Sequence, residues 1–253
     1  MNIAIINTLY WPFKVGGAEV SVQILAESLS REGHQVSIIT LTNRNHKNIT
    51  NHNGVTIYQL PLRNIYWPFS GEKRSTPQKI LWHAIDNYNF LSKQDISSIL
   101  KEVAPDVVHT NNLAGFSVSA WDAANNLNIP IVHTSRDYYL INPNTTLHNK
   151  KCQQSANSFS CKLWSLVKKI KSRKVGRYIS ISAHVQSVHS TANFFNSTPH
   201  EVIYNSIISK DGIEQQKKET PENPEDFTFG YIGRLTDAKG LNILIESFAK
   251  AGN

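Results

Sequence analysis

The chain has 253 residues, of which 40% are apolar, and a formal net charge of +7. This length suffices for one buried domain and part of another, since domains usually span about 100–200 residues. No stretch approaches the roughly 18 consecutive apolar residues of a membrane-spanning helix, the start lacks the features of a secretory signal, and Cys152 and Cys161 are too few for a disulfide framework. The sequence therefore predicts a cytoplasmic globular protein, and its charge predicts an anionic partner.

Hydrophobic periodicity along the chain alternates between strands and helices. In chain order, the sequence predicts strands at Asn2–Thr8, Gln35–Leu41, Val55–Leu60, Pro105–Thr110, Ile129–Thr134, Arg177–Ser182, Glu201–Tyr204 and Phe227–Ile232, and helices at Ala18–Glu32, Pro77–Val103 with a break near Ser92, Gly115–Leu127, Leu163–Lys174, Ala183–Asn193 and Leu241–Lys250. Ser75 precedes a helix start with proline in the first turn, and Ser92 with Asp95 resembles a capping box. The alternation predicts an α/β fold with a Rossmann-like, doubly wound parallel sheet, whose ligands bind at the carboxyl ends of the strands.

The segment Ile208–Asp226 differs in composition from the rest of the chain. It combines prolines with many acidic residues and has no long apolar run, as linkers between domains do. We therefore expect a first domain at residues 1–207, a linker at 208–226, and the opening strand and helix of a second domain at 227–253.

Two loops carry residues suited to binding phosphate. Gly16 and Gly17 precede the first predicted helix, where a glycine turn lets the backbone approach an anion. This turn matches neither the dinucleotide fingerprint nor the P-loop, and a plain tight turn is the alternative. Arg234 and Lys239 lie in the loop Gly233–Gly240 and can face one diphosphate, whose charge they would stabilise as it leaves. Surface cations without function are the alternative there.

Several segments occur in the same order as the landmarks of a known enzyme family. They are Gly16–Glu19, Asp106–His109, Val132–Tyr139, Val202–Ser206 and Gly233–Gly240. On these segments the chain resembles the family-4 retaining glycosyltransferases, which have the GT-B fold of two Rossmann-like domains. The resemblance covers the N-terminal domain and the start of the C-terminal domain, which indicates a truncated chain.

The resemblance implies transfer of a sugar from a nucleoside-diphosphate sugar, with retention of configuration, to a glycan or lipid-linked acceptor in cell-surface polysaccharide biosynthesis. It implies neither a metal nor a cofactor besides the donor. Gly16 and Gly17 would lie near the donor diphosphate and the acceptor, while Arg234 and Lys239 would hold the diphosphate. Asp137 would orient groups at the reaction centre.

The chain departs from the family pattern beside this aspartate and near its end. Arg136, the second candidate catalytic residue, stands where the family commonly has a histidine. Because arginine stays protonated and cannot carry a proton, we expect it to act as an electrostatic substitute. Asn205, expected near the donor, is followed by Ser206 instead of the usual glycine. The acidic pair that contacts the donor in the family has no counterpart here, so we expect the 253-residue chain alone to have negligible transferase activity.

Two other functions remain open from the sequence. The chain could be an inactive fragment that binds an acceptor or a membrane, because most of the second domain is missing from it. A GT-B-fold sugar-nucleotide epimerase would share the two-domain cleft. Transfer and epimerisation of a labelled donor would distinguish these functions.

The histidines and cysteines give weaker signals. His109 and His133 end neighbouring strands and could face the cleft, but histidines at such positions are more often structural. Cys152 and Cys161, with His148 upstream, match no standard zinc spacing. No metal site is predicted from these residues.

Residues 150–177 form a strongly basic region. No acidic residue occurs between Tyr138 and His200, and the predicted helix Leu163–Lys174 combines lysines with apolar side chains. Such a helix could lie at an anionic membrane surface with its lysine stems along apolar surface. A solvated helix face is the alternative. Nucleic acid is not expected as a partner, because none of the usual binding motifs appears.

Overall fold

The computed structural model describes residues 1–13, 15–149, 152–153, 158–206, 230–233, 235 and 239–251. The chain divides into two compact units, Met1–Ile207 and Ile208–Asn253, and each is considered by itself. The predicted linker, half of the strand expected at Phe227–Ile232 and the candidate Arg234 lie outside the described residues.

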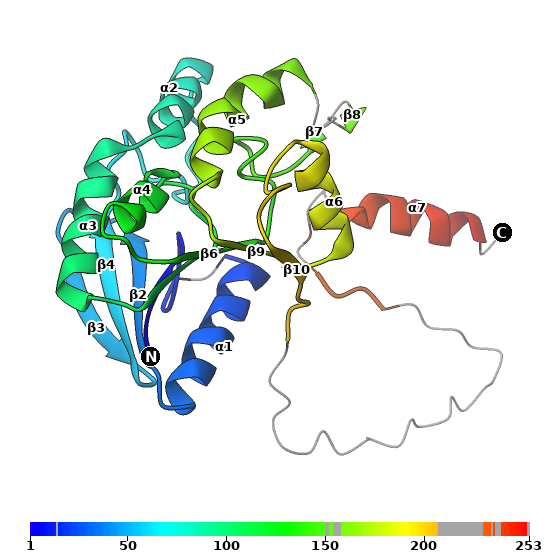
Figure 1. Cartoon of the computed structure of the whole chain (residues 1–253). Helices are drawn as coiled ribbons and strands as arrows, with labels where there is room; N and C mark the ends of the chain where they lie inside the picture. Colours follow the sequence, from blue (N-terminus) through cyan, green and yellow to red (C-terminus); the bar gives the residue numbers. More distant parts are fainter. Residues whose placement is uncertain are drawn as a thin grey trace, which may run out of the picture. The chain divides into compact units, whose positions relative to one another are not determined.

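The first unit is built on one large sheet (Figure 1). In the described part of this unit the sheet has eight strands, in the order β10-β9-β6-β5-β1-β2-β4-β3. Their bounds are β1 Asn2–Ile6, β2 Gln35–Thr42, β3 Asn48–His52, β4 Val55–Pro61, β5 Val107–Thr110, β6 Ile131–Ser135, β9 Arg177–Ser180 and β10 His200–Val202. Every neighbouring pair is parallel except β3 with β4, so the predicted Rossmann-like, doubly wound sheet is confirmed.

Helices cover both faces of this sheet. Their bounds are α1 Gly17–Arg31, α2 Thr76–Asn87, α3 Phe90–Val103, α4 Ser119–Asn125, α5 Phe159–Ser172 and α6 Ala183–Thr191, while α7 Leu241–Ala251 belongs to the second unit and β7 His148–Asn149 pairs with β8 Cys152–Gln153. Because successive side chains of a strand point to opposite faces, Ile3 and Ile5 pack with α1, whereas Ala4 and Ile6 join the core under α3 and α4. Among the described residues, no helix combines the length and apolarity needed to cross a bilayer.

In the region of α2 and α3, one predicted helix start is confirmed and one predicted cap needs correction. The start at Ser75 is confirmed, because its backbone N–H donates to Gln78 Oε1 at 3.0 Å. The long predicted helix breaks before Ser92, and the capping box assigned to Ser92 is wrong. Asn89 is the cap, with its Oδ1 accepting a hydrogen bond from the Ser92 N–H at 3.1 Å, and Ser92 is buried in the first turn of α3.

Strand β3 was not expected from the sequence. It lies at the edge of the sheet, antiparallel to β4, and its residues Asn48–His52 are mostly polar. An edge strand needs only backbone pairing on one side, so it requires no apolar pattern, and polar side chains there discourage pairing with another chain.

The predicted helix at Gly115–Leu127 begins four residues later, at Ser119, because the chain turns sharply after β5. Gly115 has a φ of +89°, in the left-handed region that favours glycine. A Cβ atom on Gly115 would lie 2.6 Å from Leu41 Cδ1 and 3.0 Å from Leu62 Cδ1. The turn therefore depends on glycine, and it fixes the segment just before it, at the carboxyl end of β5.

We expect Gly115→Ala to destabilise the protein more than Gly71→Ala does. Gly71 also has a positive φ, of +75°, but a Cβ there would meet no described atom within 4 Å. Both changes carry the backbone cost of about 1–2 kcal/mol, and overpacking at Gly115 adds about 1–3 kcal/mol. Urea unfolding of both variants measures the difference, and equal free energies of unfolding would contradict this account of the turn.

Candidate functional site

The strand order reverses at β1 and β5, which is where ligands bind in doubly wound sheets. The segments that follow these two strands are joined by hydrogen bonds. Asn7 Oδ1 accepts from the Asn112 N–H at 3.0 Å, and the Thr8 N–H donates to Asn112 O at 2.9 Å. These bonds form the floor of a polar region at the carboxyl ends of the strands.

The side chain of Arg136, just after β6, connects two other segments of this region. Its Nε donates to Asn111 Oδ1 at 2.9 Å, and its Nη1 donates to Asn205 Oδ1 at 2.5 Å. The structure therefore brings Arg136 and Asn205 together, two residues that the sequence proposed separately. Both partners of the guanidinium are neutral amides.

Asp137 lies next to Arg136 in the sequence but has different partners. Its Oδ2 accepts from Asn112 Nδ2 at 3.1 Å, and its Oδ1 accepts from the Tyr139 N–H at 2.9 Å. Burial raises the pKa of Asp137 to about 6, although the Tyr139 N–H and the charge of Lys168 both lower it, and the charge of Glu19 raises it further. The carboxylate is thus fixed in place, and it titrates close to neutral pH.

The glycine turn lies close enough to Asp137 for the charge of Glu19 to affect it. Gly16 is the cap of α1, and its N–H donates to Glu19 Oε2 at 2.7 Å. The Gly16 N–H is therefore already hydrogen-bonded to a carboxylate of the chain itself. A Cβ atom on Gly17 would meet no described atom within 4 Å, so the backbone is open there. The contact of both glycines with a donor diphosphate stays a prediction.

A pocket of about 160 Å³ opens at the same ends of the strands. It is lined by Arg136 and Asn205, by His109 and Thr134 from β5 and β6, and by Ser21 of α1. His109 Nε2 lies 2.8 Å from Thr134 Oγ1, and burial together with the charge of Arg136 lowers the pKa of His109 to about 4. The imidazole is therefore neutral at physiological pH.

Arg136 supplies the positive charge of this pocket. Burial lowers its pKa to about 10, which still leaves the guanidinium protonated at neutral pH. Within the described part of the chain Arg136 forms no ion pair with a carboxylate. Arg136 is only partly buried, and a partly desolvated cation without an acidic partner favours an anionic ligand.

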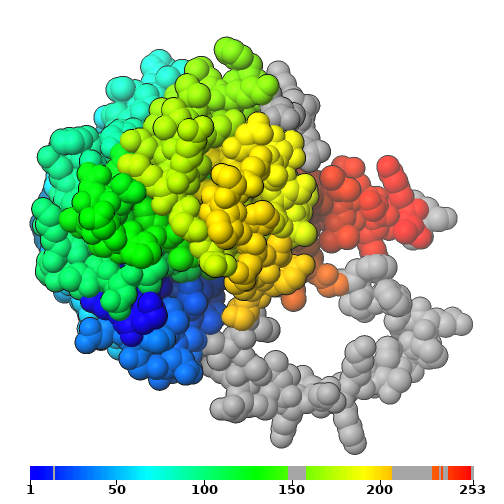
Figure 2. Space-filling model, in the orientation of Figure 1, coloured from blue at the N-terminus to red at the C-terminus, as the bar shows by residue number. Residues whose placement is uncertain are grey.

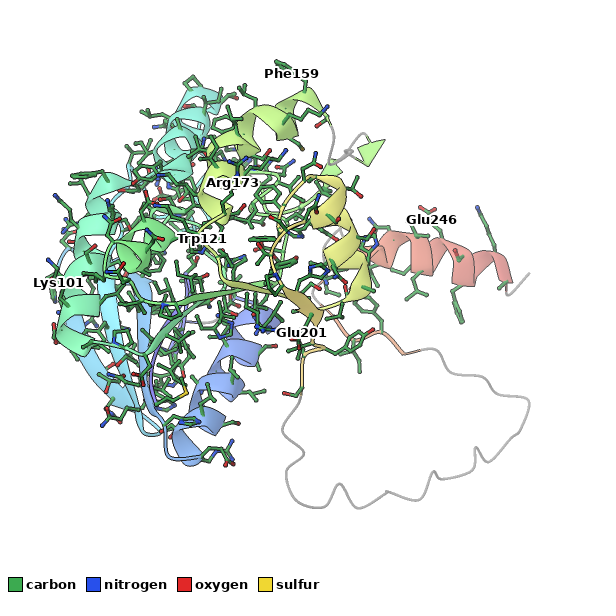
Figure 3. All side chains as sticks on the ribbon, in the orientation of Figure 1. Lys101, Trp121, Phe159, Arg173, Glu201 and Glu246 are labelled. Atoms are coloured by element: carbon green, nitrogen blue, oxygen red, sulfur yellow. The ribbon has the colours of Figure 1, made fainter. Side chains whose placement is uncertain are left out.

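His133 has a structural position. It is buried, lies 2.9 Å from Thr110 Oγ1 through its Nδ1, and packs edge-on against Trp121, which is labelled in the core in Figure 3. The structural interpretation of this histidine is confirmed, whereas His109 lines the pocket.

Several residues of the site were missed by sequence reasoning. Asn111 and Asn112 directly follow a buried strand, and such a polar pair is a signal that could have identified them. Glu19 and Tyr139 lie in landmarks already used, but no role was assigned to them. Among the other candidates, Lys239 precedes α7 in the second unit. Arg234 is outside the described residues, so its predicted role remains a prediction.

A family model described as Glycosyltransferase Family 4 matches residues 15–209. The chain belongs to glycosyltransferase family 4. The match extends from the start of the glycine turn to beyond β10, and it confirms the resemblance seen in the sequence segments.

One curated relative and two solved structures show how much of other proteins this family-4 chain spans. It is 47% identical over 242 residues to an uncharacterized 42.6 kDa protein in a cps region of Klebsiella pneumoniae, which covers 96% of this chain and 63% of that protein. The chain thus spans less than two thirds of this relative. Among solved structures, MurG of Acinetobacter baumannii is 13% identical over 81% of this chain and 46% of its own, with a TM-score of 0.43. A sucrose-phosphate synthase of Thermosynechococcus elongatus is 15% identical over 83% and 90%, with a TM-score of 0.49.

We expect Arg136→Gln to raise the pKa of His109 above its value of about 4. The guanidinium disfavours the imidazolium, so its removal favours protonation, while burial keeps the pKa below the ordinary value of about 6.5. His189 is an internal control, because burial lowers its pKa to about 4 without a contribution from Arg136. NMR titration of both imidazoles in one sample measures the effect. An unchanged His109, or an equal rise at His189, would contradict this electrostatic account.

Proposed function

We propose that this chain is the acceptor-side part of an enzyme that transfers a sugar from a nucleoside-diphosphate sugar to a glycan or lipid-linked acceptor, with retention of configuration. The observation that carries the proposal is the Arg136 guanidinium, which neutral amides hold at the pocket and which no carboxylate of the described residues neutralises. In glycosyl transfer the leaving diphosphate gains negative charge, and a fixed cation stabilises that charge.

Asp137 would act on the hydroxyl groups at the reaction centre. Two hydrogen bonds fix its carboxylate, and at pH above its pKa of about 6 it accepts hydrogen bonds from a sugar or acceptor hydroxyl. Arg136 would thus hold the leaving group while Asp137 orients the reacting sugar. Arg234 and Lys239 would add contacts to the diphosphate, and the proposed reaction uses no metal.

Membership of family 4 supports sugar transfer from a nucleotide sugar. The location of the Klebsiella relative in a cps region supports a role in polysaccharide assembly. The base and sugar of the donor would be selected by parts of the protein beyond this chain's first unit.

Binding of nucleoside diphosphates tests the proposal directly. We expect Arg136→Gln to weaken binding about tenfold or more, because charge-assisted hydrogen bonds contribute about 1.5–3 kcal/mol. Calorimetry of the 253-residue chain with UDP, GDP, ADP and CDP measures the affinity. Arg173→Gln is the matched control, since Arg173 is exposed at the end of α5. Equal affinity of the wild type and Arg136→Gln, or binding of none of the four ligands, would refute the assignment.

A specific surface supports membrane contact as a second proposal. The outer face of α5 carries four apolar side chains that are 54–83% exposed: Phe159, Leu163, Leu166 and Ile170. Phe159 lies at the outer end of the helix and points away from the core (Figure 3). We call these four residues the apolar stripe of α5. The neighbouring helix α2, which lies beside α5 at the surface in Figure 2, adds the exposed Ile80 and Leu81.

The sequence predicted that the lysines of this helix lie at the membrane-facing surface, and this prediction needs correction. Lys168 is buried, and Lys171 and Lys174 pair with the buried Asp122 at 2.6 Å and 2.7 Å, so these three lysines point into the protein. Their stems do not lie along an outer surface. Lys162 and Arg173 remain exposed beside the apolar stripe, so the proposed contact combines apolar insertion with two flanking cations.

Vesicle binding tests the membrane proposal. We expect the wild-type chain to co-sediment with vesicles that contain anionic phosphatidylglycerol more than with neutral phosphatidylcholine vesicles, and less at high salt. Replacing Leu163 and Leu166 by serine should reduce binding severalfold, because it removes apolar area from the bilayer. Ile49→Ser is the control, because Ile49 is comparably exposed but lies on the edge strand β3. Equal binding to both vesicle types, or an equal loss with Ile49→Ser, would contradict the proposal.

A further inference from the structure

Lys168 lies on the inner face of α5, opposite the apolar stripe. Its side chain is buried, with the residue only 3% exposed. Its Nζ donates to Tyr139 O at 2.7 Å and lies 3.6 Å from the centroid of the Tyr139 ring. A lysine is almost never buried to this extent without a specific partner.

Tyr139 connects this lysine to the site. Its N–H donates to Asp137 Oδ1 at 2.9 Å, and its hydroxyl donates to Asp86 O at 3.0 Å. Asp86 is itself buried in α2, where its Oδ1 accepts from the Gly115 N–H at 2.6 Å. Both polar backbone groups of Tyr139 are therefore hydrogen-bonded: its N–H to Asp137 and its carbonyl oxygen to Lys168.

The charges around Asp137 come from several elements. The charge of Lys168 on α5 lowers the pKa of Asp137 and the charge of Glu19 on α1 raises it, while Asp86 on α2 also interacts with the charge of Lys168. Burial raises the pKa of Asp86 and lowers that of Lys168, and the two charges favour each other's ionised form. Lys168 is thus a cation that offsets the buried carboxyl group of Asp86 and the partly buried carboxyl group of the candidate catalytic Asp137.

We infer that Lys168 is a positioning residue for Asp137: it fixes the Tyr139 carbonyl, and through that residue the carboxylate, and supplies the buried positive charge that this carboxylate faces. The place of Asp137 at a reaction centre rests on the proposed function. The action of Lys168 on Asp137 does not, because it depends only on contacts within the chain.

The test is the titration of Asp137 in the 253-residue chain, labelled with ¹³C at the aspartate carboxyl groups. Loss of one resonance in Asp137→Asn assigns the signal. We expect Lys168→Met to raise the pKa of Asp137 by about 1 or more, since removal of a nearby opposite charge disfavours the carboxylate. Lys168→Arg should restore a value close to that of the wild type.

Lys171→Met is the matched control. Lys171 also points inward from α5, but it pairs with Asp122 instead of facing Asp137. We expect this variant to leave the pKa of Asp137 unchanged. The inference is overturned if Asp137 has the same pKa in the wild type and in Lys168→Met, or if Lys171→Met shifts this pKa as much as Lys168→Met does.

The wild-type protein offers a second measurement if Lys168→Met does not fold. Burial lowers the pKa of Lys168 to about 8, so its titration falls in an accessible range. With ¹³C at tyrosine carbonyl carbons, and Tyr139→Phe for assignment, the Tyr139 carbonyl signal should change with an inflection near that pH. A signal that stays constant from about pH 7 to about pH 11, a range that includes the ordinary lysine pKa, would overturn the inference.

Failure of this inference can be told apart from failure of the proposed function. Lys168 is not among the described residues that line the pocket of Arg136, so nucleoside-diphosphate affinity reports only on the proposed function. Suppose that the pKa of Asp137 shifts in Lys168→Met but nucleotide binding is unchanged in Arg136→Gln. Lys168 would then remain a positioning residue, and the proposed transfer reaction would be refuted.

Discussion

The hydrogen bonds between the segments after β1 and β5 are the constraint on which the whole candidate site depends. Strand order reverses at this point, so the connections that follow β1 and β5 run in different directions. Asn7 and Asn112 close it through their side chains and backbone. Asn112 then holds Asp137, and Asn111 beside it holds Arg136. A change in this junction would displace both charged residues together.

Among the described residues, the direct hydrogen-bond partners of Arg136 and Asp137 are neutral, while the charge of Lys168 acts on Asp137 from behind them. Asparagine amides position Arg136 and one oxygen of Asp137, and a backbone N–H holds the other oxygen. Amides fix the geometry of a charge without neutralising it, so Arg136 and Asp137 keep their charges although they are adjacent in the sequence. Such an arrangement costs stability, since both groups lose solvation on folding. Binding sites commonly carry this cost because a ligand recovers it.

Most of the sheet could be predicted from the sequence because its parallel strands are buried on both faces and therefore contain β-branched runs. The edge strand β3 could not, because pairing along one side imposes no apolar pattern on residues 48–52. The cap at Asn89 was missed for a related reason, since Ser92 and Asp95 satisfy the capping pattern locally while the break lies three residues earlier. Local patterns give the existence of elements more reliably than their ends.

The site was predictable where it follows a linear motif and was not where it depends on tertiary contacts. Arg136, Asp137 and Asn205 were found from short segments in a fixed order, although nothing in the sequence indicated that Arg136 contacts Asn205. Nothing in the sequence distinguished Lys168 from the other lysines of its basic helix. Its burial depends on Tyr139, which is distant in the sequence and shows no pattern shared with α5.

The two faces of α5 leave this helix with little freedom to change its length during evolution. Lys168 and Lys171 lie on the inner side of α5, Lys174 follows just after the helix ends at Ser172, and the apolar stripe occupies the outer face. Insertion or deletion of one residue ahead of Lys168 would rotate the remaining turns by about 100°. The lysines would then leave Tyr139 and Asp122, and apolar side chains would face two buried carboxylates. Descendants of this gene can exchange one outer apolar residue for another, but we expect them to keep the number of residues in α5 constant.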